Sequence, residues 1–122
     1  MRGIFERTNM AASTSSLVQK KCSACAPGTP ALTDAQINAL LPEVPSWSVT
    51  NNVLYRTFKF KNYHETMAFV NATAWVSHRE DHHPDMEVGY NKVTMRYSTH
   101  SVGGLTENDF ICAAKIGQLV NE

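Results

Sequence analysis

Two stretches of this sequence each predict a β-hairpin, and the longest helix-forming stretch lies between them. Residues 47–60, WSVTNNVLYRTFKF, have a strand-like pattern on both sides of Asn51-Asn52, a pair that tolerates the positive φ angles of a tight turn. Residues 85–100, DMEVGYNKVTMRYSTH, repeat the arrangement around 89–92. Because a lone hairpin is barely stable in water, the two hairpins are expected to join in one four-stranded antiparallel sheet.

Three other stretches predict helices, at 34–41, 62–81 and 107–120. Thr33 or Asp34 can cap the first helix, because their side-chain oxygens accept hydrogen bonds from the free backbone amides of a first turn. The order of elements is then α-β-β-α-β-β-α. We therefore expect an α+β fold in which three helices cover one face of the four-stranded antiparallel sheet.

The long helix has a start signal and a stop signal. Asn62 can cap its first turn, and Glu65 three residues later can complete a capping box. Pro84 ends it, because the residue before a proline avoids the helical region. Helical spacing predicts a buried stripe that consists of Tyr63, Met67, Val70, Ala74 and Ser77, with Phe69 and Val76 widening it.

Alternation in the strands and spacing in the last helix predict which side chains share a face. In the first hairpin, one face of the second strand carries Leu54, Arg56, Phe58 and Phe60. In the second hairpin, Val93, Met95 and Tyr97 point one way, and Thr94, Arg96, Ser98 and His100 point the other. The last helix follows a Gly103-Gly104 turn and a Thr106 cap, and its inward side chains are expected to be Phe110, Ala113, Ala114 and Gly117.

The first 31 residues differ from the rest in composition. They are rich in Ser, Ala, Thr and Gly and show no sustained period, so we expect a disordered extension at 1–31 before a single domain at 32–122. Basic residues and serines give this extension a weak likeness to a mitochondrial transit peptide. Glu6 and the poor amphipathicity disfavour that interpretation, and a cytoplasmic protein is expected.

The chain has 3 cysteines, an odd and small number that predicts no disulfide framework and suits a reducing compartment. Cys22 and Cys25 form a lone C-x-x-C in the extension. Without a second pair it is a weak signal for zinc or redox chemistry, and two free thiols is the favoured interpretation.

Charge and hydropathy exclude two classes of function. Lys plus Arg number 11, as do Asp plus Glu, so the chain lacks the basic excess of a protein that binds nucleic acid directly. Apolar runs fall short of the roughly 20 residues of a membrane span, so no membrane association is expected.

Four of the 5 histidines lie within residues 76–104. His78 and His82 are four apart, so a helix would put them on one face. His82 and His83 stand where the long helix unwinds before Pro84, and His100 follows the last strand. Imidazole gains and loses protons near cellular pH, so this gathering predicts proton transfer to and from a small molecule.

A metal site is the alternative that the spacing leaves open. His78 and His82 have the separation of ligands on a helical metal site, but the metalloprotease pattern needs glutamate directly after the first histidine. Arg79 stands there instead, and a cation disfavours a divalent metal. His64, near the start of the long helix, is expected to be a solvated surface residue.

The segment from His82 to Phe110 resembles the pterin-4a-carbinolamine dehydratases. The signature of that family falls on the following residues of this chain: His78, His82-His83-Pro84, Tyr90, His100 and Asp109. The flanking GYNKVTMRYSTHSVGGLT, the upstream LYRTFKFKNYHETMAFV and Trp47 extend the resemblance over Leu32 to Glu122.

The resemblance implies a lyase that removes water from 4a-hydroxytetrahydrobiopterin. The product is quinonoid dihydrobiopterin, so the reaction recycles the pterin used by aromatic amino-acid hydroxylases. It implies no metal and no organic cofactor. It also implies a homodimer or homotetramer, and in some members a second role as the dimerisation cofactor of a homeodomain transcription factor, which would add a nuclear location.

The residues of this chain that match the family's site positions are expected to have the same roles. The resemblance implies His82, His83, His100 and Asp109 as catalytic residues, with His83 and His100 on the acid side and His82 as base or orienter. Asp109 can also cap the last helix with Thr106, and the two roles are compatible. The expected substrate-binding residues are His78, Pro84, Met86, Thr99, Ser101 and Val102.

Two departures from the family pattern and two alternative functions remain. His78 stands where many members have a carboxylate, which changes the local charge. Met86 stands where many have tryptophan, which affects affinity and substrate range. One alternative is an interaction protein that uses the small residues Ala113, Ala114 and Gly117 for helix contact, although plain self-association explains them as well. The other is a pterin-binding protein without activity, which the intact histidines argue against.

Overall fold

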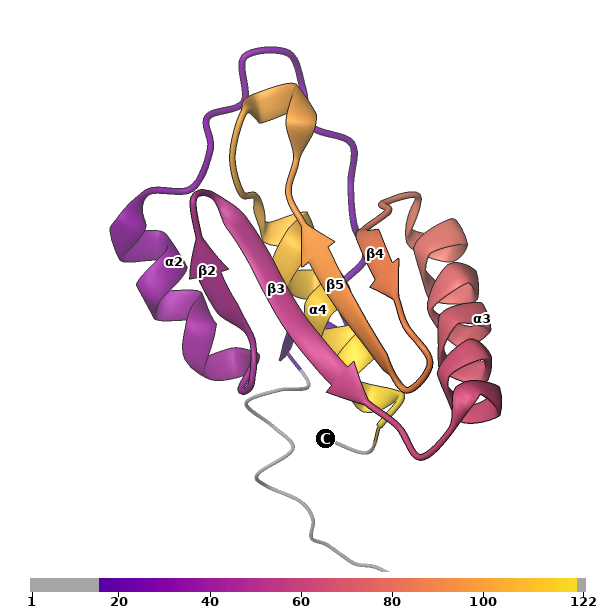
Figure 1. The fold of residues 1–122 in the computed structure, drawn as a ribbon. Coiled ribbons are helices and arrows are strands. Elements are labelled where there is room, and N and C mark those ends of the chain that lie inside the picture. The colour runs from indigo at the N-terminus through magenta and orange to yellow at the C-terminus, as the bar shows by residue number, and fades with distance from the viewer. Residues whose placement is uncertain (1–15, 121–122) are drawn as a thin grey trace, which may run out of the picture.

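The computed structural model describes residues 16–120 of the chain, and four antiparallel strands form its centre. The strands lie in the order β2-β3-β5-β4 (Figure 1). Their bounds are β2 Ser48–Thr50, β3 Val53–Lys59, β4 Asp85–Val88 and β5 Lys92–Tyr97. Both hairpins are therefore confirmed. The pairing of β3 with β5 joins them into one sheet.

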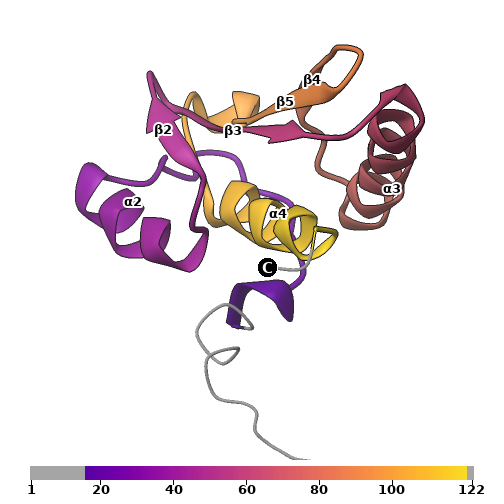
Figure 2. The same ribbon diagram turned by 60° about the horizontal axis from the view of Figure 1, so that its bottom comes forward.

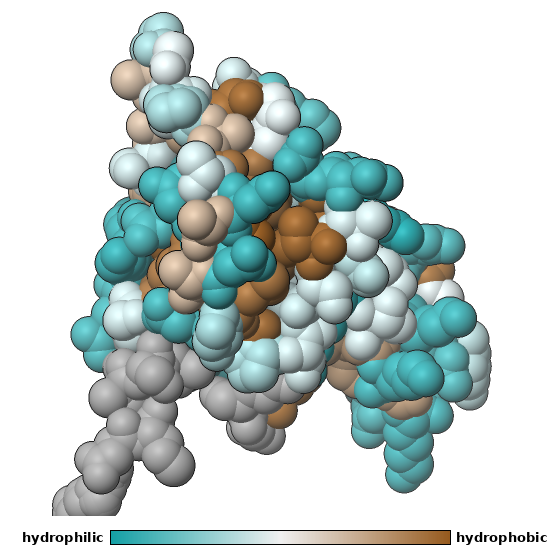
Figure 3. Space-filling model, turned by 90° about the vertical axis from the view of Figure 1, so that its left-hand side faces the viewer, coloured by the Kyte–Doolittle hydropathy of each residue, from teal (hydrophilic) through white to brown (hydrophobic). Residues whose placement is uncertain are grey.

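Three helices lie on one side of this sheet (Figure 2), so the expected α+β class and element order are confirmed. Their bounds are α2 Asp34–Leu40, α3 Tyr63–Glu80 and α4 Glu107–Gln118. Short 3-10 helices follow α2 at Leu41–Glu43 and β5 at His100–Val102. On the side that carries α2 (Figure 3), hydrophilic side chains cover most of the surface, with apolar side chains in patches between them.

Most of the predicted turn and cap residues form the turns and helix caps that were expected of them. Asn51 and Asn52 have φ angles of 51° and 63°, as a two-residue hairpin turn requires. Thr33 forms a capping box with Gln36 at the start of α2. The capping box expected for α3 is wrong in one half. Asn62 accepts a hydrogen bond from the Glu65 amide, but the Glu65 carboxylate accepts from the amide of Lys61 instead.

The core lies between the helix side of the sheet and α4. The predicted inward row of β5 is confirmed, because its three apolar side chains are fully buried. The inward side of α4 is confirmed as well. Aromatic rings fill the space towards α3, with centroids 5.9 Å apart for Trp47 and Phe58 and 4.6 Å apart for Phe58 and Phe69. Such contacts supply most of the favourable free energy of a domain this small.

The buried stripe of α3 differs from the prediction. The buried residues are Thr66, Phe69, Thr73, Ser77 and Glu80, whereas Tyr63 is 53% exposed. The buried line runs beside the predicted one and carries mostly polar side chains. Three of them satisfy their hydroxyl groups on nearby backbone carbonyls, as Ser77 does on the carbonyl of Thr73, 2.8 Å away. Apolar periodicity therefore predicted Phe69 and Ser77 correctly but missed the buried polar residues Thr66, Thr73 and Glu80.

Residues 16–31 are ordered, so the expectation of a disordered extension is wrong for this part. Leu17 is only 1% exposed and belongs to the core. From there the segment passes the end of the helix at 63–80 and the start of the helix at 107–118, loops around the 3-10 helix at 100–102 and returns to α2 (Figure 1). Leu32 then donates a backbone hydrogen bond to Leu105. Residues 1–15, including Arg2 and Arg7 of the weak targeting pattern, lie outside the described residues.

The small side chains of α4 face this same segment. Ala113, Ala114 and Gly117 line a cavity of about 40 Å³ together with Val18 and Trp47. Within the described part of the chain, the face that was expected to accept another helix is thus covered by the chain itself.

Leu17→Ala is expected to lower the free energy of unfolding by about 2–4 kcal/mol, because it removes a fully buried side chain from the core. Urea unfolding followed by circular dichroism measures the change. Gln19→Ala is the matched control, since Gln19 is exposed two residues away. Equal stability of the two variants would show that the segment does not pack as described.

Candidate active site

The ring of His82 is turned into the protein where α3 ends. Asp81 adopts a left-handed conformation, with φ 51° and ψ 42°, and so terminates the helix. The amide of His82 donates to the carbonyl of Ser77, and its ring stacks on Tyr97 with centroids 5.8 Å apart and planes inclined by 9°. The expectation that His78 and His82 share a helix face is therefore wrong. His78 stays exposed on α3, with its ring 6.3 Å from that of Trp75.

The carboxylate of Asp109 contacts the ring of His82. Its Oδ1 lies 2.6 Å from Nε2 of His82, and the carboxylate is fully buried. Its Oδ2 accepts hydrogen bonds from the amide of Thr106 at 3.0 Å and from the hydroxyl of Thr99 at 2.8 Å. Asp109 thus caps α4 and orients the histidine at the same time, as its two compatible roles require.

This arrangement decides which nitrogen of His82 is available for chemistry. An ionised carboxylate only accepts hydrogen bonds, so Nε2 of His82 carries the proton between the two groups. Within the part of the chain that the structure describes, Nδ1 has no hydrogen bond to another residue. Nδ1 is then the nitrogen that can take a proton from a bound molecule or, in the imidazolium form, give one.

Tyr97 supports the ring of His82 from the β5 side. Its hydroxyl group is buried and has no hydrogen-bond partner among the described residues. Burial, with a smaller contribution from nearby Cys112, raises the pKa of Tyr97 above its usual value. The phenol therefore stays neutral, and its main contribution is the flat surface on which the imidazole lies.

His82 opens into a pocket of about 360 Å³. Two predicted binding residues, Thr99 and Ser101, line this pocket with it. The remaining lining residues were not predicted, and they are Lys21, Cys22, Ser23, Ala24, Cys25, Arg79, Glu80, Asp81 and Asn108. A pocket of this size with one oriented imidazole fits a small polar ligand.

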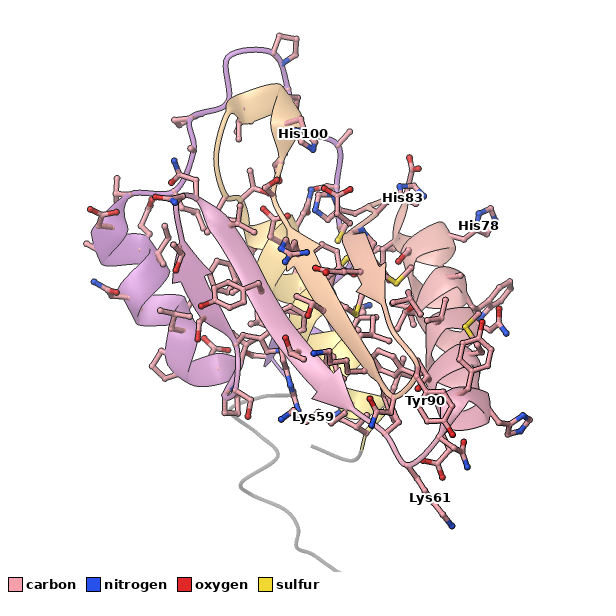
Figure 4. All side chains as sticks on the ribbon, viewed as in Figure 1. Lys59, Lys61, His78, His83, Tyr90 and His100 are labelled. Atoms are coloured by element: carbon pink, nitrogen blue, oxygen red, sulfur yellow. The ribbon has the colours of Figure 1, made fainter. Side chains whose placement is uncertain are left out.

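The other predicted site residues lie outside this lining. His83 and His100 are both exposed and lie at the same end of the sheet (Figure 4). The strand β5 ends at Tyr97, so His100 belongs to the following 3-10 helix and does not extend the row of Thr94, Arg96 and Ser98. It borders a neighbouring depression of about 250 Å³ that shares Thr99 with the His82 pocket.

Three predicted binding residues, Pro84, Met86 and Val102, do not line the pocket around His82 either. The sulfur of Met86 lies 3.6 Å from the hydroxyl oxygen of Thr73, which places this side chain against α3. His78, on the same helix as Thr73, is also absent from the pocket lining.

Sequence reasoning missed Glu80, which is 8% exposed beside the pocket. Its carboxylate accepts hydrogen bonds from Lys115 at 2.8 Å and from the amide of Cys22 at 2.9 Å. Burial by itself would raise the pKa of Glu80, but these donors and the positive charge of Lys115 outweigh it and hold the pKa below 4.5. No sequence pattern pointed to Glu80, because one of its partners, the backbone amide of Cys22, lies in a segment that was expected to be disordered.

Residues 16–120 show neither a metal site nor a membrane span. Among residues 16–120, no three side chains of His, Cys, Asp or Glu lie close enough together to hold a metal ion. No described helix combines the length and the hydropathy that a membrane crossing needs.

Comparisons with known proteins agree with this fold. Residues 30–119 match the family model described as pterin 4 alpha carbinolamine dehydratase. A candidate pterin-4-alpha-carbinolamine dehydratase of Nitrosomonas eutropha is 54% identical over 105 residues, which is 85% of this chain and 93% of the relative. One from Xanthomonas euvesicatoria is 57% identical over 93 residues, 75% of this chain and 79% of the relative.

Solved structures show the same fold. A structure described as transcriptional coactivator/pterin dehydratase from Brucella melitensis has a TM-score of 0.70 and 31% identity, and covers 73% of this chain and 97% of its own. A pterin dehydratase-like protein described as a RuBisCO assembly factor of the alpha-carboxysome has a TM-score of 0.53 and 23% identity, over 62% of this chain and 88% of its own. At that identity the second likeness concerns the fold alone.

The four-stranded antiparallel sheet with helices on one face defines an α+β protein. At one end of the sheet, a histidine that contacts a buried aspartate forms a candidate site for proton transfer. Together with the family match over residues 30–119, this shows that the chain belongs to the pterin 4 alpha carbinolamine dehydratase family.

Glu80→Gln is expected to reduce stability at pH 7 by about 1–3 kcal/mol, because a charge-assisted hydrogen bond becomes a neutral one. The pKa of Glu80 is lower in the folded state than its ordinary value of 4.5. The stabilisation is therefore present above that value and is lost as the pH falls through the folded pKa. Urea unfolding of both proteins between pH 7 and pH 3 should show the difference shrinking.

Glu87→Gln is the matched control for this experiment. Glu87 pairs with Arg96 at 3.2 Å, but its side chain is 74% exposed, so the change should cost less than about 1 kcal/mol. A Glu80→Gln protein as stable as wild type at pH 7 would contradict the buried ion pair.

Proposed function

We propose that this protein catalyses the dehydration of 4a-hydroxytetrahydrobiopterin to quinonoid dihydrobiopterin. The single observation that carries the proposal is the 2.6 Å contact between His82 and the buried Asp109, at the wall of a pocket of about 360 Å³. Family membership supports it, since the relatives described above are candidate enzymes of this kind.

The reaction needs two proton transfers. The hydroxyl group on C4a of the pterin leaves as water when an acid protonates it, and loss of the proton on N5 allows the C4a=N5 double bond to form. His82, with Asp109 on Nε2, is the base that takes the N5 proton at Nδ1. His83 and His100, which are exposed at the same end of the sheet, are the acid side of this proposal.

Orientation explains why the base is built in this way. Asp109 accepts from Nε2 of His82, and it favours the imidazolium form once the proton has been taken. Because Asp109 is itself fixed by Thr99 and Thr106, the ring has little freedom to turn. Each positioned acid or base of this kind contributes about 10²–10⁴-fold to a rate.

The proposal needs no metal and no organic cofactor, because both steps are proton transfers. The substrate would come from an aromatic amino-acid hydroxylase, which leaves its pterin as the 4a-carbinolamine. Dehydration then returns the pterin towards its active form, so the protein would act in pterin recycling, in the cytoplasm.

Self-association is part of the same proposal. β4 is an edge strand, bonded only to β5 within the described chain, and the side chains of Met86 and Val88 are 36% and 43% exposed. A second copy that pairs with this edge would satisfy its free backbone groups. A role for α4 in recruiting a transcription factor has less support, because its small residues are covered by Val18 and Trp47.

His82→Ala and Asp109→Asn are each expected to lower kcat by about 10²–10⁴-fold, because one removes the base and the other its orienting carboxylate. Stopped-flow absorbance of the carbinolamine, produced by a hydroxylase, measures the rate with and without the protein. His64→Ala is the matched control, an exposed histidine on α3 that should leave the rate unchanged. A wild-type protein that does not accelerate carbinolamine loss would rule out the proposed activity.

A further inference from the structure

Hydrogen bonds hold the segment Lys20–Cys25 against the end of α3 and the start of α4, next to the candidate site. The backbone amide and carbonyl of Ser23 both bond to the side chain of Asn108, at 3.1 and 2.8 Å. The amide of Cys22 bonds to Glu80, and the ammonium group of Lys21 donates to the carbonyl of Arg79. These contacts tie the segment to the end of α3 and the start of α4, between which His82 and Asp109 meet.

The same segment forms one side of the catalytic pocket. Its residues 21–25 line the pocket of about 360 Å³ together with His82, Thr99 and Ser101. The family match begins at residue 30, so this side of the pocket is supplied from outside the matched domain. Ser23, Ala24 and Cys25 are all small, which keeps the pocket open.

We propose that residues 21–25 are a specificity wall of the active site, which sets how bulky a pterin the pocket accepts. The inference rests on the proposed dehydratase function. Because the wall contacts the substrate without taking part in proton transfer, it acts on binding. Changes in it are expected to alter KM and leave kcat nearly unchanged.

The test is a bulky substitution on the wall. Ala24→Trp places an indole in the pocket, and it should raise KM for the carbinolamine at least tenfold while kcat stays within twofold of wild type. Ala26→Trp is the matched control, because Ala26 is exposed two residues further on and does not line the pocket. Thermal unfolding of both variants checks that the fold is intact, and Ser23→Trp replaces Ala24→Trp if that variant is unstable.

The outcomes separate this inference from the proposed function. If Ala24→Trp and Ala26→Trp both keep the wild-type KM in an active enzyme, residues 21–25 do not act as a specificity wall, and the dehydratase assignment stands. If the wild-type protein neither turns over the carbinolamine nor binds a stable dihydropterin, the proposed function fails and the wall fails with it.

A second observation concerns the thiols behind this wall. The sulfur atoms of Cys22 and Cys112 lie 3.6 Å apart, and the sulfur of Cys112 is 3.9 Å from the backbone carbonyl oxygen of His82. Cys112 is buried in α4, whereas Cys22 is half-buried and borders the pocket. A reagent in the pocket therefore meets Cys22 first.

We infer that Cys22 and Cys112 form a reversible disulfide by exchange with a low-molecular-weight disulfide such as oxidised glutathione. The Cys22 thiolate attacks one reagent sulfur and the first thiol leaves. The Cys112 thiolate then attacks the Cys22 sulfur, and the second thiol leaves. The protein loses two electrons, the reagent gains them, and each thiol proton lost by the protein is matched by one gained by a leaving thiolate.

The geometry needs only a small movement. A disulfide has a sulfur–sulfur distance of about 2.0 Å, so the pair must approach by on the order of 1.5 Å, which the half-buried Cys22 can supply. A hydrogen bond with Cys22, and burial after it, raise the pKa of Cys112 above its ordinary value. Cys112 is accordingly the thiol that reacts second. The bond would fix the wall covalently to α4.

Thiol counting after treatment with oxidised glutathione tests this without reference to pterins. The wild-type protein should fall from 3 free thiols to one, and peptide mapping by mass spectrometry should find Cys22 joined to Cys112. Cys25→Ser is the matched control and should still form the bond, whereas Cys112→Ser should stop at a glutathione adduct. Detection of a Cys22–Cys25 bond, or of adducts alone in wild type, would overturn the inference.

Discussion

The buried carboxylate of Asp109 is the interaction on which the rest of this structure depends. It caps the first turn of α4, bonds to Thr99 after β5 and holds His82 after α3. Three elements that are separate in the chain therefore meet at one side chain. A fully buried carboxylate is costly unless each oxygen is satisfied, so the stability of this junction and the orientation of the histidine have the same origin.

This junction also explains where the pocket lies. The end of α3, the exit of β5 and the start of α4 leave an opening beside His82, and the N-terminal segment closes one side of it. Glu80 and Asn108 connect that segment to the two helices, so the same residues shape the pocket and hold its outer wall. Activity and local order are therefore expected to change together when the segment is disturbed.

Much of the fold could be predicted because its signals are local. The Asn51-Asn52 turn, the Thr106–Asp109 cap and the buried row of β5 each follow from a few neighbouring residues. The histidine motif predicted a gathering of imidazoles, and the structure places His83 and His100 at the same end of the sheet. The prediction failed for part of the buried face of α3, where polar residues such as Thr73 bond to their own helix and carry no apolar signal.

The sequence by itself determined the order of elements, the turns, the caps and the residues available for proton transfer, because each depends on side chains within one or two turns of each other. Only the tertiary structure decided that Leu17 belongs to the core, that His82 turns inward after Asp81, and that Cys22 meets Cys112 across 90 positions of chain. Contacts between residues so far apart depend on how the elements pack, and they leave no periodic pattern in either partner's own neighbourhood.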